Sequence, residues 1–166
     1  MQSRKPKKHI DPIAQFMQEH DEMLIHLSSL NKAAASIAAH GFSVDAFNRV
    51  LAATHFIEDE VGVHNKREEE ALFPVLERYV EGPTRLMRED HKYLKKEFVR
   101  LRRAVTRLDK KKENQSAASE LETVAKSIVQ RFVNHIHKEN HILFPLVQKF
   151  LTKDALREVA RRMIHS

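Results

Sequence analysis

Apolar residues recur every three or four positions over most of the chain, which is the spacing of one buried face of an α-helix. The third expected helix shows it most clearly, with Leu94, Phe98, Leu101, Val105 and Leu108. Interruptions at Gly, Pro and capping residues divide the chain into expected helices over about residues 12–40, 44–80, 84–111, 117–150 and 152–164. Four long helices joined by short loops predict an all-α fold, an up-down-up-down four-helix bundle with a short C-terminal helix.

The expected helix boundaries carry local signals. Asp11 is a good N-cap and Pro12 suits the first helical position, whereas Gly41 is suited to end the helix. Pro74 lies inside the second helix and has no amide hydrogen to donate to the carbonyl four residues back. We therefore expect a kink near Phe73.

One sequence motif occurs twice. It reads HNKREEEALFP at residues 64–74 and HIHKENHILFP at residues 135–145, so that a histidine, a glutamate four residues later and Leu-Phe-Pro coincide. The step is 71 residues, and an upstream pair of histidines is separated by the same step. The matched ionisable residues are His20, His64 and Glu68 in one half and His91, His135 and Glu139 in the other. This pattern predicts an internal duplication of a two-helix unit.

All six of these residues continue the apolar stripes of their helices. The stripe of the third helix reaches His91 three positions before Leu94, and that of the fourth is expected to continue beyond Glu139 to Ile142 and Leu146. A lone buried histidine is usually a hydrogen-bonded core residue, but an unpaired buried carboxylate costs several kcal/mol. No Lys or Arg shares these stripes within one turn, so a bound cation is the expected compensation for the two glutamates.

The donor set narrows the choice of cation. Four imidazoles and two carboxylates without a thiolate suit iron, with manganese or zinc as alternatives, whereas calcium and magnesium prefer all-oxygen sites. Two histidines per ion and two bridging glutamates would give each of two ions about four protein ligands. That arrangement leaves room for a bridging oxide or hydroxide and for an open position.

The two copies of the motif, with His20 in QEHDEM and His91 in REDHKYL, resemble the hemerythrin-like HHE cation-binding family over about residues 12–150. The resemblance implies a four-helix bundle around a non-haem di-iron centre, with Glu68 and Glu139 as the bridges. The implied metal ligands are His20, His64, Glu68, His91, His135 and Glu139.

The chain departs from the oxygen-carrying hemerythrins at two positions. Lys95 stands where they have a further histidine, and Asn140 stands where they have an aspartate. The chain is therefore more similar to a six-ligand branch of the family. That branch includes bacterial di-iron proteins linked to nitric oxide stress and iron–sulfur repair, and a eukaryotic iron-sensing domain.

The resemblance implies a protein that binds or reacts with a small diatomic ligand, dioxygen or nitric oxide, or with peroxide. Whether it turns such a molecule over as a di-iron oxidoreductase stays open. Two alternatives also stay open: iron sensing, storage or donation with a metal-dependent fold, and a basic interaction module with a structural metal.

The length and composition of the chain limit the number of domains, the kinds of site and the location that these hypotheses allow. The 166 residues suit one domain, which we place at 12–166 after a basic tail at 1–11. No cysteine is present, which excludes disulfides, zinc–thiolate sites and iron–sulfur clusters. No apolar run is long enough to span a membrane and no secretory signal is evident, so we expect a cytoplasmic protein. The oligomeric state is left open.

The net charge of +6 raises the question of a nucleic-acid partner. Basic residues form a stripe on the third helix, composed of Lys92, Lys96, Arg100, Arg103 and Arg107. We interpret this stripe as a solvated face and do not expect nucleic acid, because no aromatic residues interleave for base stacking.

Most of the other ionisable residues near the motifs are expected to point away from the metal ligands. His55, His137 and His141 are expected off the ligand face, and Glu69 and Glu70 are expected to face solvent. The spacing does not decide whether Glu60, Tyr79 or Tyr93 approaches the centre.

Overall fold

The computed structural model describes residues 10–166 and contains helices and no strands in that range. The elements are α1 (Pro12–His40), α2 (Val44–Phe56), η1 (Ile57–Val61), α3 (Gly62–Arg67), η2 (Glu68–Leu72), α4 (Phe73–Leu76), α5 (Pro83–Lys110), α6 (Gln115–Lys138), η3 (Glu139–Leu143), α7 (Phe144–Phe150) and α8 (Lys153–Ile164). The expected all-α bundle is thereby confirmed. Residues 1–9 of the expected tail lie outside the described residues, and the division into tail and domain stays a prediction.

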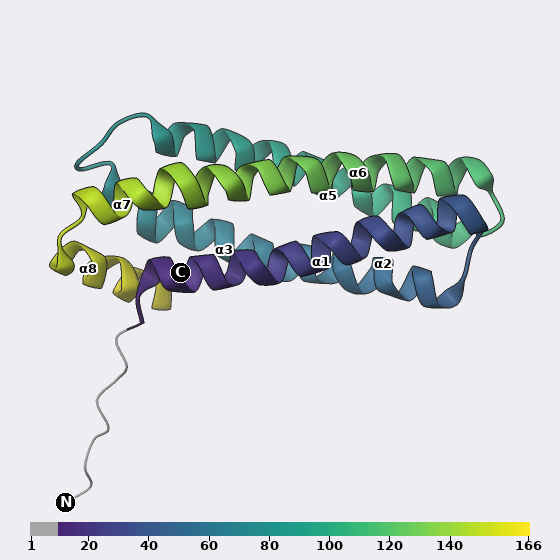
Figure 1. The fold of residues 1–166 in the computed structure, drawn as a ribbon, viewed down its shortest axis with the longest axis horizontal. Helices are drawn as coiled ribbons and strands as arrows, with labels where there is room; N and C mark the ends of the chain where they lie inside the picture. The colour runs from purple at the N-terminus through teal and green to yellow at the C-terminus, as the bar shows by residue number, and fades with distance from the viewer. Residues whose placement is uncertain (1–9) are drawn as a thin grey trace, which may run out of the picture.

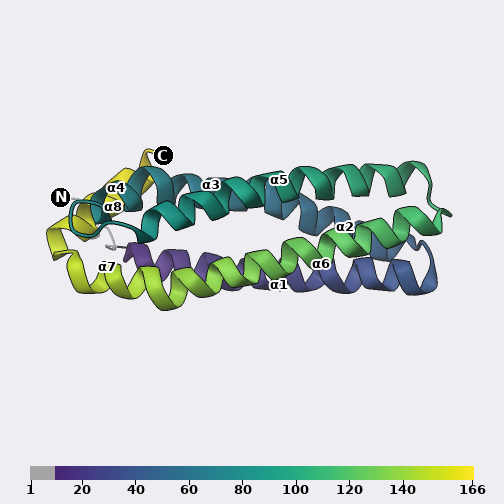
Figure 2. The ribbon, with the colours of Figure 1, turned by 90° about the horizontal axis from the view of Figure 1, so that it is seen from above.

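The elements form four long rods that run side by side (Figures 1 and 2). The second rod is the continuous run from α2 to α4, and the fourth is the run from α6 to α7. Helix α1 packs against α2 and α6, and α5 packs against α6. Helix α8 folds back across one end of the bundle, where it contacts η2 and α1.

Capping side chains mark the starts of α1, α2, α6 and α8. Asp11 accepts a hydrogen bond from the Ile13 amide at 3.0 Å, as an N-cap should. Gly41 ends α1 with a φ of 90°, which a residue with a side chain rarely adopts. The second rod ends at Leu76, not near residue 80, because residues 77–82 are needed to reverse the chain direction before α5.

Three five-residue segments, η1, η2 and η3, are π-helical, and the sequence analysis did not predict them. Two of them directly precede the Phe-Pro pairs of the repeated motif. The Phe73 amide donates to the Glu68 carbonyl five residues back, and Phe144 donates in the same way to Glu139. The wider turn accommodates a proline that cannot donate four residues back and would clash there. The kink expected near Phe73 therefore takes the form of a π-helical turn.

The hydrophobic core is divided into two clusters. The larger one lies between α1, α2, α5 and α6, and the smaller one lies between the start of α1, α4, α7 and α8. One core prediction was wrong, because Ile142 is 52% exposed while Leu143 is fully buried. The π-helical turn at η3 shifts the buried stripe by one residue, so that Leu143 and Val147 face inward instead of Ile142 and Leu146.

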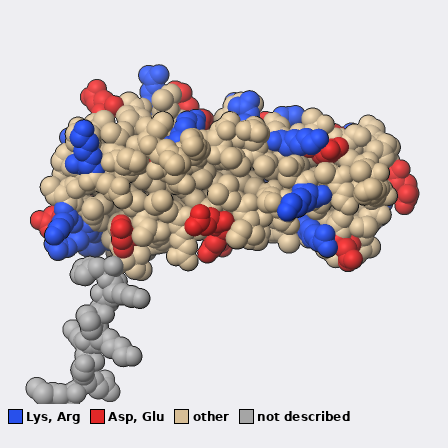
Figure 3. All heavy atoms as spheres, in the orientation of Figure 1, with Lys and Arg blue, Asp and Glu red and all other residues tan. Residues whose placement is uncertain are grey.

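Basic and acidic side chains share the outer surface. On the face drawn in Figure 3, Lys and Arg side chains are interspersed with Asp and Glu. In the basic stripe of α5, Arg100 pairs with Glu97 and Arg107 pairs with Glu120. Over the part of the chain that is described, none of the helices has the length and hydropathy needed to cross a membrane.

Candidate metal centre

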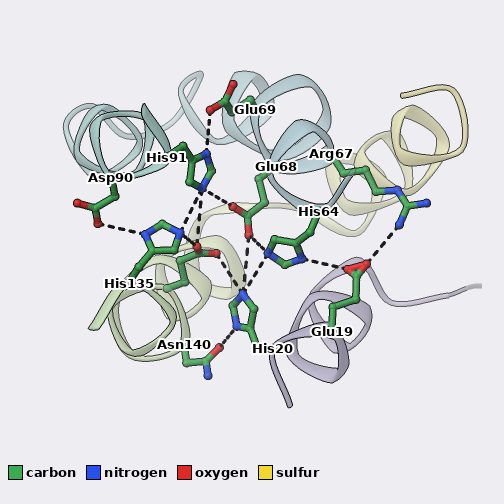
Figure 4. A network of polar contacts seen from close by, with 11 residues as sticks. Glu19, His20, His64, Arg67, Glu68, Glu69, Asp90, His91, His135 and Asn140 are labelled. Atoms are coloured by element: carbon green, nitrogen blue, oxygen red, sulfur yellow. Dashed lines mark hydrogen bonds and ion pairs between the residues drawn. The ribbon is translucent and has the colours of Figure 1, made fainter. Parts of the chain in front are cut away.

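The six ionisable residues of the repeat converge between the two core clusters (Figure 4). They form two groups that share both glutamates. The first group is His20, His64, Glu68 and Glu139, and the second group is Glu68, His91, His135 and Glu139. Within each group, one nitrogen or oxygen atom from every residue lies within 4.8 Å of the others. All six side chains are at least 95% buried, so the groups are shielded from bulk water.

Each shared carboxylate directs one oxygen toward each group. Oε1 of Glu68 lies 2.7 Å from Nε2 of His64, and Oε2 lies 3.1 Å from Nε2 of His91. Oε2 of Glu139 lies 3.5 Å from Nε2 of His20, while its Oε1 contacts the second group. Two carboxylates that span two groups in this way have the geometry of bridging ligands.

The histidines of each group face one another through Nε2. This Nε2–Nε2 distance is 3.2 Å between His20 and His64 and also 3.2 Å between His91 and His135. Two nitrogen ligands about 2.1 Å from one ion, at a right angle, would lie about 3 Å apart. The spacing therefore fits a shared cation, whereas two facing lone pairs without one would repel.

Every histidine of the two groups also has a hydrogen-bond partner at Nδ1, on the side away from the centre. These four pairs are His64 with Glu19 at 3.1 Å, His135 with Asp90 at 3.1 Å, His91 with Glu69 at 2.8 Å and His20 with Asn140 at 2.7 Å. A carboxylate oxygen and the amide oxygen of Asn140 can only accept, so the hydrogen sits on Nδ1 and, in a neutral imidazole, the lone pair of Nε2 points into the centre. The partners thus fix the tautomer that a metal ligand needs.

Sequence reasoning missed these outer partners, although the duplication contains them. Glu19 and Asp90 each precede the first histidine of their half, and Glu69 and Asn140 each follow the glutamate. A basic residue also recurs at the same step: Arg67 pairs with Glu19 at 3.2 Å, and Lys138 pairs with Asp90. The signal was the 71-residue step itself, applied to the neighbours of the matched residues.

Glu69, which we expected to face solvent, is partly exposed but also contacts a histidine of the centre. Its Oε1 lies 2.8 Å from Nδ1 of His91, and its side chain is 39% exposed. The cause is the π-helical turn η2, in which the angle between successive side chains is smaller than in an α-helix. Glu68 can therefore face the centre while the next residue reaches the outer side of His91.

The network carries more negative than positive charge. Five carboxylates, from Glu19, Glu68, Glu69, Asp90 and Glu139, meet two cationic side chains, from Arg67 and Lys138. With neutral imidazoles, three negative charges remain. The four oxygens of the two central glutamates are buried without a hydrogen-bond donor. Such a site requires protons or metal cations.

The raised pKa values of three histidines, His64, His91 and His135, result from this excess of negative charge. Burial alone lowers the pKa of His64, but the charge of Glu68 and the hydrogen bond to Glu19 raise it to about 10. Burial also lowers the pKa of His91, but the two central glutamates raise it to about 10. Burial likewise lowers the pKa of His135, but the central glutamates and the hydrogen bond to Asp90 raise it to about 9. A site that holds protons so firmly binds divalent cations in competition with them.

Phenylalanine rings surround the histidines. Phe144 stacks on His20 with ring centroids 5.5 Å apart, and Phe73 stacks on His91 at 5.8 Å. The edges of two more rings approach the remaining histidines, at 5.1 Å between Phe16 and His64 and at 6.2 Å between Phe132 and His135. This packing accounts for the repeated Leu-Phe-Pro: its phenylalanine covers a histidine of another helix.

The other residues weighed from the sequence lie away from the centre. Glu60, Glu70, His55, His137 and His141 are exposed, as are Tyr79 at 45% and Tyr93 at 41%. Tyr93 stacks against the Arg131 guanidinium and lines a small cavity of about 140 Å³ together with Asp90 and His135. This cavity is a candidate path from the surface to the outer side of His135.

Comparison with known protein families gives one result for most of the chain. The model of the hemerythrin HHE cation binding domain matches residues 11–147 and, in a second match, residues 82–166. No curated protein matches the chain.

Proposed function

The chain belongs to the hemerythrin family of HHE cation-binding domains, and on that premise we propose that it is a non-haem di-iron protein that binds or reacts with dioxygen, nitric oxide or peroxide. The observation that carries the proposal is the pair of four-residue groups sharing both carboxylates. His20 and His64 would hold one ion and His91 and His135 the other. Glu68 and Glu139 would bridge them.

The choice of iron rests on the donor set. Each ion would have two imidazole nitrogens and two carboxylate oxygens, a mixture that suits iron, with manganese and zinc as alternatives. Two divalent ions would also offset the three negative charges of the network, which no further Lys or Arg among residues 10–166 pairs with. The four protein donors leave positions open on each ion.

The surroundings favour a small uncharged ligand. Bound ferrous ions supply electrons and open positions to a diatomic molecule or to peroxide. The four phenylalanine rings exclude water and bulky or charged substrates from the histidines. The Nδ1 hydrogen bonds hold the imidazoles in place, so that the open positions keep their orientation.

The symmetric ligand set argues against reversible oxygen carriage. Lys95, which stands where the oxygen carriers have a further histidine, is exposed on α5 and adds no ligand. Both ions would therefore be under-coordinated, and an open ferrous pair is readily oxidised. We expect irreversible oxidation by dioxygen or peroxide, and binding of nitric oxide.

Iron sensing is the second candidate function, favoured by the charge of the centre. Without a metal ion, only protons on the histidines can compensate the two buried carboxylates, so metal binding would stabilise the fold. Such coupling is what a sensor of iron supply requires. The site is also almost fully buried, which suits retention of the ion more than rapid donation.

One set of measurements tests the proposal. Protein produced in iron-replete cells is analysed for metal content, reduced without oxygen, and mixed with dioxygen, nitric oxide or peroxide while its absorbance is followed. About two iron ions per chain and a fast, irreversible change with dioxygen support the reactive centre. A change that reverses under argon would establish an oxygen carrier instead. Two ions per chain with no response to any of the three would overturn the reactive centre and favour iron sensing or a structural metal.

A further inference from the structure

The two groups of the centre differ in one outer partner. His64 and His135 each donate to a carboxylate that is itself paired with a basic residue. The other two histidines occupy corresponding positions in the repeat but have different partners. His91 donates to the carboxylate of Glu69, whereas His20 donates to the amide oxygen of Asn140.

This difference places one additional negative charge beside the second group. Among the described residues, no Lys or Arg forms an ion pair with Glu69, so its charge is not offset as that of Glu19 is by Arg67. Asn140 is neutral. The outer partners of the first group therefore carry no net charge, and those of the second group carry a charge of minus one.

An outer carboxylate strengthens the histidine as a metal ligand. It accepts the Nδ1 hydrogen more strongly than an amide does and increases electron density at Nε2. Its charge also attracts a cation through the shielded interior. Both effects act on His91 and are absent or weaker at His20. The two groups thus have the same kinds of inner ligand, but the second group lies in a more negative electrostatic environment than the first.

Resting on the proposed function, we infer that the second group, with His91 and His135, binds a divalent metal more tightly and fills first. The first group, with His20 and His64, fills second and is the position from which an ion is lost more readily. Glu69 and Asn140 act as positioning residues that set this order. Changes to such outer partners typically alter metal affinity by about 10- to 100-fold, so two clearly separated binding steps are expected.

The test is an anaerobic titration of metal-free protein with Fe²⁺, and with Co²⁺ as a coloured probe, by calorimetry and absorbance. Wild-type protein should bind two ions in steps whose dissociation constants differ by about tenfold or more. Glu69→Gln should weaken the tighter step and bring the two together. Asn140→Asp should tighten the weaker step, and the two substitutions combined should restore two unequal steps.

Glu70→Gln is the matched control. It removes the same charge one residue further along, from an exposed side chain without a contact to a histidine of the centre. This variant should bind both ions as the wild type does. Two equal steps in the wild type, or the same effect of Glu69→Gln and Glu70→Gln, would overturn the inference while leaving the di-metal centre intact. Absence of any metal binding would instead overturn the proposed function.

Discussion

Without metal, this protein should become less stable as the pH rises through the neutral range. Protons then provide the positive charge that the two central glutamates require. The pKa of His64 is about 10 in the folded protein, against about 6.5 in an unfolded chain. Below pH 6.5 both states hold the proton, and the stabilisation is complete. Between the two pKa values only the folded state holds it, so the stabilisation falls as the pH rises and is lost above about 10.

The size of the effect follows from proton linkage. One proton bound by the folded state alone changes the free energy of unfolding by about 1.4 kcal/mol per pH unit. His64 by itself should therefore lower the stability of the metal-free protein by about 2 to 3 kcal/mol between pH 7 and pH 9. His91 and His135, with raised pKa values of about 10 and 9, interact with the same carboxylates. Their contributions add to this loss but are smaller than those of independent groups.

Bound metal should reverse the sign. A metal ligand must be a neutral imidazole, so binding releases protons and becomes tighter as the pH rises. The assay is urea unfolding followed by the helical circular dichroism signal, between pH 6.5 and 9, with metal and with a chelator. The two series should diverge as the pH increases. A metal-free stability that is constant or rises from pH 7 to pH 9 would refute the reasoning.

A double variant, Glu68→Gln with Glu139→Gln, isolates the cause. It removes the two central charges that raise the histidine pKa values but keeps the hydrogen bonds to Glu19 and Asp90, so the pH dependence without metal should become clearly weaker. At pH 9 this metal-free variant should be more stable than the metal-free wild type, because neutral amides replace two uncompensated carboxylates. His137→Gln removes an exposed histidine and should leave the wild-type pH dependence intact.

Three further outcomes follow from the same geometry. Elemental analysis of the double glutamine variant should find less than one tightly held metal ion per chain, in place of about two. Asp90→Asn should weaken metal binding by about 10- to 100-fold in a competition titration, whereas the neighbouring, exposed Glu89→Gln should have no effect. Phe144→Ala should destabilise the metal-loaded protein by about 3–5 kcal/mol in chemical unfolding, because the ring is fully buried, and the half-exposed Phe150→Ala should cost less than about 1 kcal/mol.

The sequence was sufficient to predict most of the helices and to identify the six residues that meet at the centre. Periodic apolar positions, the capping Asp11 before α1 and Pro83 at the start of α5 mark where these helices begin, since such signals are local. The six inner residues were recognisable because ionisable groups interrupt apolar stripes at one fixed step. A buried stripe leads into the centre of a bundle whatever the details of packing, so these residues had to meet.

The outer partners could not be predicted in the same way. Glu19 lies one residue before His20, about a quarter turn away, and contacts the histidine of a different helix, His64. Which neighbour it reaches depends on how two rods are rotated and offset, and periodicity within one helix carries no such information. The 71-residue repeat shows that Asp90 is equivalent to Glu19, but it does not show which histidine either residue contacts.

The π-helical turns connect the irregularity of the fold with the chemistry of the centre. In both halves the turn begins at the glutamate that the two groups share, and the next residue, Glu69 or Asn140, contacts a histidine on its outer side. The phenylalanine that closes the turn then covers that same histidine, and the proline after it is accommodated because the hydrogen bond reaches five residues back. A regular α-helix would rotate each of these side chains away from the others. The repeated Leu-Phe-Pro therefore shapes the centre through the backbone conformation as well as through the phenylalanine side chain. For the same reason, the α-helical spacing of three and four residues does not predict which residues are buried after each π-helical turn.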